Sequence, residues 1–292
     1  MKRNVDYIIE KGKVRQRFKL KPVFVFIFSA LFTVLIISGV QYVEERGKNE
    51  KEEQSEIIEG VETVVPDFIE LDTVSEGRKL EKVGERTVYL TFDDGPGEHT
   101  ARLLDVLGKY DVKATFFVTC KGSDDLILRE FKEGHTVALH TCSHNYAIYQ
   151  SAETYFSDLN AISNRVSRIT GKEAKLIRFP GGSSNAISAR YNKGIMTFLT
   201  SEVERRGYKY FDWNVSSGDA SNNVSTAEVV FSNVINGVDR RGEGSFSVIL
   251  QHDIKGFSVD AVEGIIQYGL SNGYKFEALT EDSPVTHHRV SN

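Results

Sequence analysis

The strongest constraint on the fold is an alternation of short apolar runs and helical segments between Arg86 and Leu279. Continuous apolar runs of this length are typical of parallel strands that are buried on both faces of a sheet. The expected strands cover residues 87–92, 114–118, 136–139, 175–179, 208–213, 246–250 and 274–279. About seven strand–helix units predict an α/β fold, and they favour a (β/α) barrel over an open sheet.

The residues before Arg86 have a different character. Residues 22–43 form a long apolar run, and six Lys and Arg residues precede it between Lys11 and Lys21. A charge-free span of about 20 apolar residues can cross a bilayer as a helix, with its basic flank on the cytoplasmic side. We expect a basic cytoplasmic tail over 1–21, an uncleaved transmembrane helix over 22–43 and a flexible acidic stalk over 44–85. A signal peptide cut after Gly39 is the alternative.

The composition excludes several classes of protein. Lys and Arg number 36 against 41 Asp and Glu, so the net charge of -5 gives no reason to expect a nucleic-acid partner. The chain has two cysteines, which rules out a disulfide framework and a four-cysteine zinc site. Cys120 and Cys142 follow neighbouring strands, and the sequence leaves open whether they form a disulfide.

Polar residues follow the expected strands at the same end, which is where barrel enzymes place their active sites. Each has an ordinary explanation when taken alone: the sequence from Asp93 to Pro96 is a common turn, and Arg178 could be a surface charge. Their joint occurrence at corresponding strand ends predicts one site. The residues are Asp93, Asp94, His140, His144, Arg178, Asp212, Trp213, Asp219, His252 and Asp253.

The residue types at this end predict metal-assisted hydrolysis. Asp94, His140 and His144 form a three-ligand set of the kind that binds zinc and leaves positions open for water. No Glu lies between the two histidines, so the base must come from elsewhere, and Asp93 is the neighbour. A cation beside that carboxylate would keep it ionised, and Arg178 is the candidate.

A leaving amine and a developing oxyanion need further groups. The departing amine must receive a proton, and His252 is the candidate general acid. An Asp such as Asp219 would orient that imidazole. The oxyanion would be stabilised by the metal and by a backbone N–H.

Five segments occur in an order that resembles the motifs of the polysaccharide deacetylase family, which is carbohydrate esterase family four or the NodB homology domain. They are residues 91–96, 140–144, 178–182, 212–219 and 250–252. The resemblance covers a catalytic domain over 86–281, followed by a C-terminal tail over 282–292. It implies a distorted (β/α) barrel with seven strands. It also implies a hydrolase of linear amides that removes N-acetyl groups from a carbohydrate, using one zinc ion or a similar divalent ion such as cobalt.

The resemblance also implies a role for each matched residue. The roles fall into a catalytic group of Asp93, Arg178, His252 and Asp219, a metal-binding group of Asp94, His140 and His144, and a substrate-binding group of Gly181, Trp213 and Leu250. In the first group, Asp93 matches the base and His252 the acid, and Arg178 and Asp219 pair with them. The Gly181 N–H matches the oxyanion donor. Trp213 and Leu250 match the walls around the acetyl methyl group.

Two positions depart from the family pattern. Cys142 lies between the metal histidines, where a thiol could compete for zinc, and the segment after Trp213 lacks the usual further acid and second aromatic residue.

The anchor and the stalk indicate a substrate outside the membrane, and we expect peptidoglycan N-acetylglucosamine. N-acetylmuramic acid, poly-N-acetylglucosamine, chitin oligomers and acetylxylan are alternatives within the same chemistry. Two other classes stay open, namely a non-catalytic glycan-binding module and a hydrolase of small amides on the same barrel. The intact set of base, acid and metal ligands argues against the first, and the anchor argues against the second.

Overall fold

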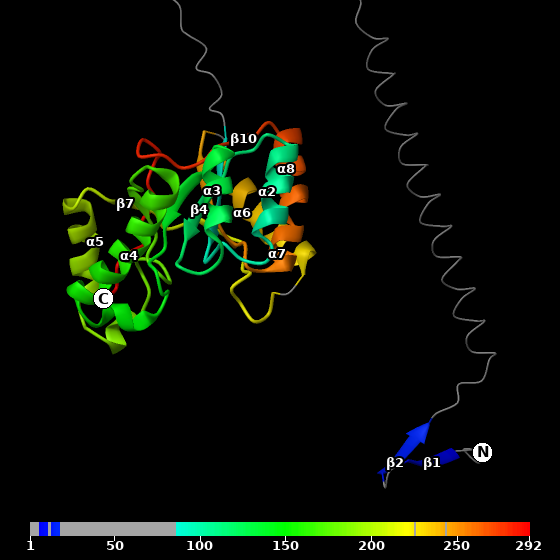
Figure 1. Ribbon diagram of the computed structural model, residues 1–292. Coiled ribbons are helices and arrows are strands. Elements are labelled where there is room, and N and C mark those ends of the chain that lie inside the picture. Colours follow the sequence, from blue (N-terminus) through cyan, green and yellow to red (C-terminus); the bar gives the residue numbers. More distant parts are fainter. Residues whose placement is uncertain (1–5, 11–12, 18–85, 225, 243) are drawn as a thin grey trace, which may run out of the picture. The chain divides into compact units, whose positions relative to one another are not determined.

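The computed structural model describes residues 6–10, 13–17 and 86–292, except 225 and 243 (Figure 1). The predicted transmembrane helix over 22–43 and the predicted stalk over 44–85 lie outside these residues. Within the described part, none of the helices is long and apolar enough to cross a membrane. Near the N-terminus, β1 (Asp6–Glu10) and β2 (Lys13–Arg17) pair as antiparallel strands.

From Arg86 onward, strands and helices alternate as predicted. The order is β3 (Thr87–Asp93), α2 (Thr100–Lys109), β4 (Thr115–Val118), α3 (Asp124–Lys132), β5 (Thr136–Leu139), η1 (Tyr146–Gln150), α4 (Ala152–Thr170), β6 (Leu176–Ile177), η2 (Ser188–Arg190), α5 (Ile195–Arg205), β7 (Lys209–Tyr210), β8 (Val215–Ser216), α6 (Ala227–Asp239), β9 (Phe246–His252), α7 (Gly256–Asp260), α8 (Val262–Ser271) and β10 (Lys275–Phe276).

The strands form a parallel sheet in the order β7-β6-β5-β4-β3-β9-β8, which curves with the helices on its outside (Figure 1). β10 pairs with the start of β3, at Thr87 and Val88, whereas β4 pairs with its end. The end strands β7 and β8 are not paired with each other. The prediction of a distorted parallel barrel is therefore confirmed, and the barrel is open between these two strands.

The region between β7 and β8 differs from the expected single strand over 208–213. β7 ends at Tyr210 because the carbonyl groups of Phe211 and Asp212 accept hydrogen bonds from the Arg178 side chain, at 2.9 and 3.0 Å. The chain then turns and forms β8, which pairs with β9. The sequence did not predict β8, because two residues are too few to show a strand period.

Apolar residues cover both faces of the sheet. The larger cluster lies between the sheet and the helices and includes Leu90 and Phe92 of β3. A smaller cluster fills the inside of the barrel and includes Tyr89 of β3 and Phe117 of β4. This alternation along β3 is the period of two expected for a strand. Because both faces are apolar up to the strand ends, polar side chains are concentrated beyond those ends.

The helices begin and end at residues with the appropriate capping chemistry, and α4 shows this clearly. The Ser151 hydroxyl accepts a hydrogen bond from the Thr154 N–H at 3.2 Å, and the Thr154 hydroxyl accepts one from the Ser151 N–H at 3.0 Å. At the other end, Gly171 has a φ of 72°, a left-handed conformation that costs glycine little. These caps set the two ends of α4. Asp158 of this helix contacts the loop that follows β5 and contributes to the candidate site.

Candidate active site

The sheet register brings the predicted site residues to one level. Asp93 is paired with His252 on β9. The N–H groups of His140 and Arg178 donate to the carbonyls of Val118 and Leu139, both at 2.9 Å. The carboxyl ends of β3, β5, β6 and β9 therefore meet, and the side chains that follow these strands are brought together.

Arg178 and Asp93 form a buried ion pair at the centre of this end. The Arg178 side chain is 0% exposed, and its Nη1 donates to Asp93 Oδ1 at 2.8 Å and to Thr91 Oγ1 at 2.7 Å. The guanidinium also packs 4.1 Å from the centre of the Phe117 ring. Together with the two carbonyls beyond β7, these contacts fix the orientation of the Asp93 carboxylate. Its other oxygen, Oδ2, lies 3.7 Å from His140 Nε2 and has no hydrogen bond within the described residues.

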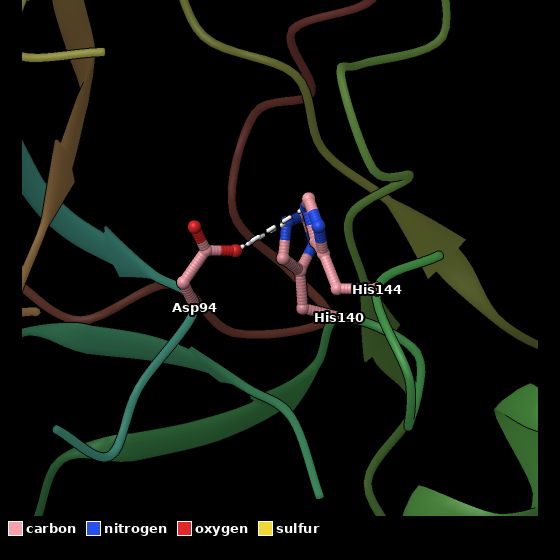
Figure 2. A group of neighbouring side chains, drawn as sticks. All are labelled: Asp94, His140 and His144. Atoms are coloured by element: carbon pink, nitrogen blue, oxygen red, sulfur yellow. Dashed lines mark ion pairs between the residues drawn. The ribbon is translucent and has the colours of Figure 1, made fainter. Parts of the chain in front are cut away.

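Asp94, His140 and His144 point toward one another, as Figure 2 shows. Asp94 Oδ1 lies 3.6 Å from His140 Nε2 and 3.3 Å from His144 Nε2. Ligand atoms about 2.0–2.1 Å from a tetrahedral zinc ion lie roughly 3.3 Å from one another. Asp94 Oδ1 is also buried without a hydrogen-bond partner, although buried polar atoms normally have one. The three side chains therefore fit a divalent cation.

The electrostatic environment prepares these groups as metal ligands. Burial raises the pKa of Asp94, but the neighbouring His140 and His144 outweigh this and leave its pKa below the usual value. Burial, followed by the charge of His140, lowers the pKa of His144. Metal binding requires ionised carboxylates and neutral imidazoles, and both shifts favour those forms.

The loop that carries both histidines is held by contacts with three residues, namely Asp158, Cys120 and Arg178. The N–H groups of Cys142 and Ser143 donate to Asp158 Oδ2 at 2.7 and 3.0 Å, and Cys142 forms a disulfide with Cys120. His140 Nδ1 makes a hydrogen bond with the Arg178 carbonyl at 2.8 Å, which leaves Nε2 for the cation site. Thr141 and His144 have left-handed φ values of 62° and 50°, which are costly for residues other than glycine. The disulfide and Asp158 thus constrain a strained loop.

Removing the disulfide is expected to loosen this loop. Closing a loop between residues 22 apart in sequence stabilises a folded chain by about 3 kcal/mol, so Cys120→Ser/Cys142→Ser should lower the free energy of unfolding by a similar amount. Affinity for zinc should fall about tenfold because the histidine loop loses a support. Urea unfolding and competition with a chromophoric chelator measure the two effects. A reducing agent should affect the wild type and leave the double variant unchanged. Equal zinc affinity in both proteins would show that Asp158 and the His140–Arg178 hydrogen bond hold the loop without the disulfide.

His252 and Asp219 form a second acid–base pair. Asp219 Oδ1 lies 2.8 Å from His252 Nδ1, and its Oδ2 accepts hydrogen bonds from the His252 N–H at 2.8 Å and from the Ser258 hydroxyl at 2.7 Å. Burial disfavours the charged imidazole, but the hydrogen bond with Asp219 and its charge outweigh burial and raise the pKa of His252. Nε2 of His252 has no hydrogen bond within the described residues, so it is available to a substrate.

The pH dependence follows from this pair. If protonated His252 donates to the leaving amine, kcat decreases as the pH rises through the pKa of His252, which Asp219 raises. Asp219→Asn removes that charge, so the alkaline limb of the kcat profile should move to lower pH. Ser258→Ala is the matched control, because it removes a hydrogen bond to Asp219 and keeps the carboxylate. The alkaline limb of its kcat profile should move less than that of Asp219→Asn. An alkaline limb that stays in place in Asp219→Asn would show that another group donates the proton.

The predicted substrate-binding residues lie around the same end. Gly181 and Gly182 have φ values of 76° and 78°. A Cβ on Gly181 would lie 2.8 Å from the Tyr146 hydroxyl, and one on Gly182 would lie 3.0 Å from the Trp213 ring. Glycine is therefore required at both positions by conformation and by space. Leu250 lies on β9 two residues before His252, so their side chains share one face of the strand.

Some residues of this region carried no signal in the sequence. Asp158 lies within the helix α4, and nothing in its spacing indicates that it reaches the histidine loop. Asp212 was predicted near the site as one of several acids; its carboxylate accepts hydrogen bonds from the Ser183 N–H at 2.8 Å and from the His288 N–H at 2.7 Å. His288 was expected in a tail. Thr91 begins the segment 91–96, but nothing in the sequence indicated that its hydroxyl accepts a hydrogen bond from Arg178.

The Arg178–Asp93 ion pair and the His252–Asp219 pair lie at the same sheet end as the cation site, because Asp93 and His252 are paired across β3 and β9. A carboxylate, an imidazole and a cation site together are the arrangement of a metal-dependent hydrolase. Comparison with known proteins defines the family. Residues 81–195 match the profile named Polysaccharide deacetylase. The chain is 37% identical over 202 residues to a peptidoglycan-N-acetylglucosamine deacetylase of Bacillus cereus, covering 68% of this chain and 71% of the relative. The chain therefore belongs to the polysaccharide deacetylase family, as the motifs indicated.

Further relatives support this assignment. The crystal structure of the catalytic domain of peptidoglycan N-acetylglucosamine deacetylase from Eubacterium rectale is 52% identical and superposes with a TM-score of 0.69, covering 76% of this chain and 98% of that chain. A chitin deacetylase of Pestalotiopsis sp is 31% identical over 206 residues, covering 68% of this chain and 62% of the relative. The protein is thus a hydrolase of the deacetylase class.

Proposed function

We propose that the protein removes N-acetyl groups from peptidoglycan N-acetylglucosamine on the outside of the cell. The observation that carries this proposal is that Asp93, held by Arg178, and His252, held by Asp219, end neighbouring strands at the sheet end that carries the Asp94, His140 and His144 set. One group is oriented to take a proton and the other to give one, next to a cation site. Hydrolysis of an amide requires both transfers.

The residues would divide the reaction as follows. The three ligands would hold one divalent ion, for which we propose zinc, and this ion would supply Lewis-acid chemistry that lowers the pKa of water and polarises a carbonyl. Asp93 Oδ2 would take the proton of the attacking water, while Arg178 keeps the carboxylate in place. The Gly181 N–H would donate to the oxyanion. His252 Nε2 would then protonate the departing amine, oriented by Asp219.

The substrate class rests on the relatives. Two relatives that are 37% and 52% identical to this chain are named for peptidoglycan N-acetylglucosamine. We also propose that residues 22–43 anchor the chain as a single transmembrane helix, with residues 44–85 as the stalk and residues 86–281 as the catalytic domain outside. An enzyme tethered in this way works on the adjacent cell wall.

Acetate release tests the proposal. The described residues from Arg86 onward belong to one compact unit, so a fragment covering residues 77–292 can be produced. It is incubated with purified peptidoglycan, with zinc or cobalt and with a chelator, and Asp93→Asn is assayed in parallel. We expect metal-dependent acetate that is absent in the variant. Mass spectrometry of muropeptides then assigns the lost acetyl to N-acetylglucosamine or N-acetylmuramic acid. Activity on chitin oligomers, poly-N-acetylglucosamine or acetylxylan but not on peptidoglycan would mean that this other glycan is the substrate. A folded, metal-loaded protein that is inactive on all of these glycans would indicate a binding module.

A further inference from the structure

The C-terminal residues 281–292 (red in Figure 1) lie against β7 and the residues that follow it, and then against α5. The N–H groups of Lys209 and Phe211 point toward β6 and donate to the carbonyls of Lys175 and Ile177. The N–H of Asp212 points to the opposite edge and donates to the Thr286 carbonyl at 2.8 Å. Further along, the N–H of Thr197 donates to the Asn292 carbonyl at 2.7 Å. Residues 286–288 therefore lie along the free edge of the chain that continues from β7.

His288 is the residue of this segment that reaches the candidate site. Its ring lies edge-on to the Trp213 ring, with centroids 4.6 Å apart, and its Nε2 lies 2.7 Å from the Trp213 carbonyl. Because a carbonyl can only accept, Nε2 carries the proton. Nδ1 lies 3.2 Å from the Ser184 hydroxyl. One imidazole thus connects Trp213 with the loop that follows Gly181 and Gly182.

The backbone of His288 extends this connection. Its N–H donates to Asp212 Oδ2 at 2.7 Å, and Asp212 Oδ1 accepts from the Ser183 N–H at 2.8 Å. Asp212 is fully buried, so both bonds form away from water and the carboxylate has few alternative positions. The C-terminal segment, Asp212 and the Gly181 loop therefore form one hydrogen-bonded unit. Trp213 lies at its edge and faces the Gly182 backbone.

We propose that His288 is a positioning residue, which holds Trp213 and the Gly181 loop in the geometry that acetyl transfer requires. This inference rests on the proposed function, because it concerns the wall and the oxyanion donor of that same site. The reacting groups come from other elements, and His288 touches none of them. Its effect passes through the Trp213 carbonyl and ring and through Ser184. Displacement of about 1 Å in such groups can cost up to a hundredfold in rate.

The chain provides a direct probe, since Trp213 is its single tryptophan. In the full chain, solubilised in detergent, His288→Ala removes the ring and retains the backbone bond to Asp212. We expect the fluorescence emission of Trp213 in this variant to shift to longer wavelength and its quenching by acrylamide to increase. With zinc and an N-acetylated glycan, kcat should fall about tenfold with KM changed less than about threefold. His288→Gln can again donate from Nε2 to the Trp213 carbonyl, so it should restore most of both properties.

His287→Ala is the matched control in the same segment. The His287 ring stacks on Tyr210 with centroids 3.7 Å apart, and its Nε2 lies 3.1 Å from the Tyr210 carbonyl, so its loss removes a histidine of the same segment and leaves every contact of His288 with Trp213, Ser184 and Asp212 in place. The Trp213 emission, the acrylamide quenching and the kcat of His287→Ala should match those of the wild type. The proposal is overturned if His287→Ala reproduces the effects of His288→Ala, or if His288→Ala leaves both emission and kcat unchanged. If the wild type releases no acetate from any glycan, the proposed function fails, while the fluorescence of the variants still decides whether His288 positions Trp213.

Discussion

Asp93→Asn is expected to lower kcat for acetate release by about a thousandfold while the protein still binds zinc. General-base catalysis contributes about 10²–10⁴-fold in rate, and asparagine cannot accept the proton of the attacking water. The substitution keeps the shape of the side chain, and its Oδ1 can still accept a hydrogen bond from Arg178 Nη1. The fold and the three metal ligands should therefore be retained. Acetate release, thermal unfolding and zinc titration measure the three properties on one preparation.

The matched control is Asp125→Asn, which changes an exposed acid in the first turn of α3. It should leave kcat, stability and zinc affinity as in the wild type. Asp93 Oδ2 lies 3.7 Å from His140 Nε2, so the outcome for zinc is informative. Loss of zinc in Asp93→Asn would assign this carboxylate to the metal site. Retention of zinc with nearly full kcat would remove it from the role of base.

Arg178→Met is expected to have the largest effect on stability, with a loss of about 3–5 kcal/mol in the free energy of unfolding. The guanidinium is fully buried and donates to Asp93, Thr91 and two backbone carbonyls. Methionine fills a similar volume but donates nothing. The variant therefore leaves a buried carboxylate without its cation and the carbonyls of Phe211 and Asp212 without their donor. Urea unfolding followed by circular dichroism gives the difference.

Arg205→Met controls for the loss of an arginine as such. Arg205 pairs with Glu202 on the surface of α5, and its side chain is 70% exposed, so the expected loss is below about 1 kcal/mol. Arg178→Lys keeps the charge and loses the fork of donors, and its stability should fall between those of Arg178→Met and the wild type. A loss below about 1 kcal/mol for Arg178→Met would mean that water or a rearranged side chain replaces the guanidinium at the centre of the barrel.

The structure explains why the site depends on residues far from the chemistry. Asp94, Thr141 and His144 have left-handed backbones with φ values of 75°, 62° and 50°. Such conformations cost free energy, and they persist where the surroundings determine them. The disulfide, Asp158 and the pairing of β3 with β4 and β9 provide those surroundings. The positions of the candidate metal ligands therefore depend on these distant contacts.

Local sequence patterns were enough to predict the parallel α/β fold and the position of the candidate site. Buried strands need apolar side chains on both faces, so the polar residues at their carboxyl ends are visible without any structure. The spacing of His140 and His144, and the adjacent Asp93 and Asp94, are local features that a short stretch of chain expresses. For the same reason, the ends of the longer strands and helices could be predicted closely.

Contacts between residues far apart in the chain could not be predicted and became apparent in the folded protein. It forms the Cys120–Cys142 disulfide, brings Asp158 of α4 to the histidine loop and places His288 against Trp213. It also leaves the barrel open between β7 and β8 and places residues 286–288 along the free edge beyond β7. These contacts join residues separated by 16 to about 75 positions, with no periodic pattern to mark them. Their existence depends on how strands and helices pack in space, which local sequence patterns do not encode.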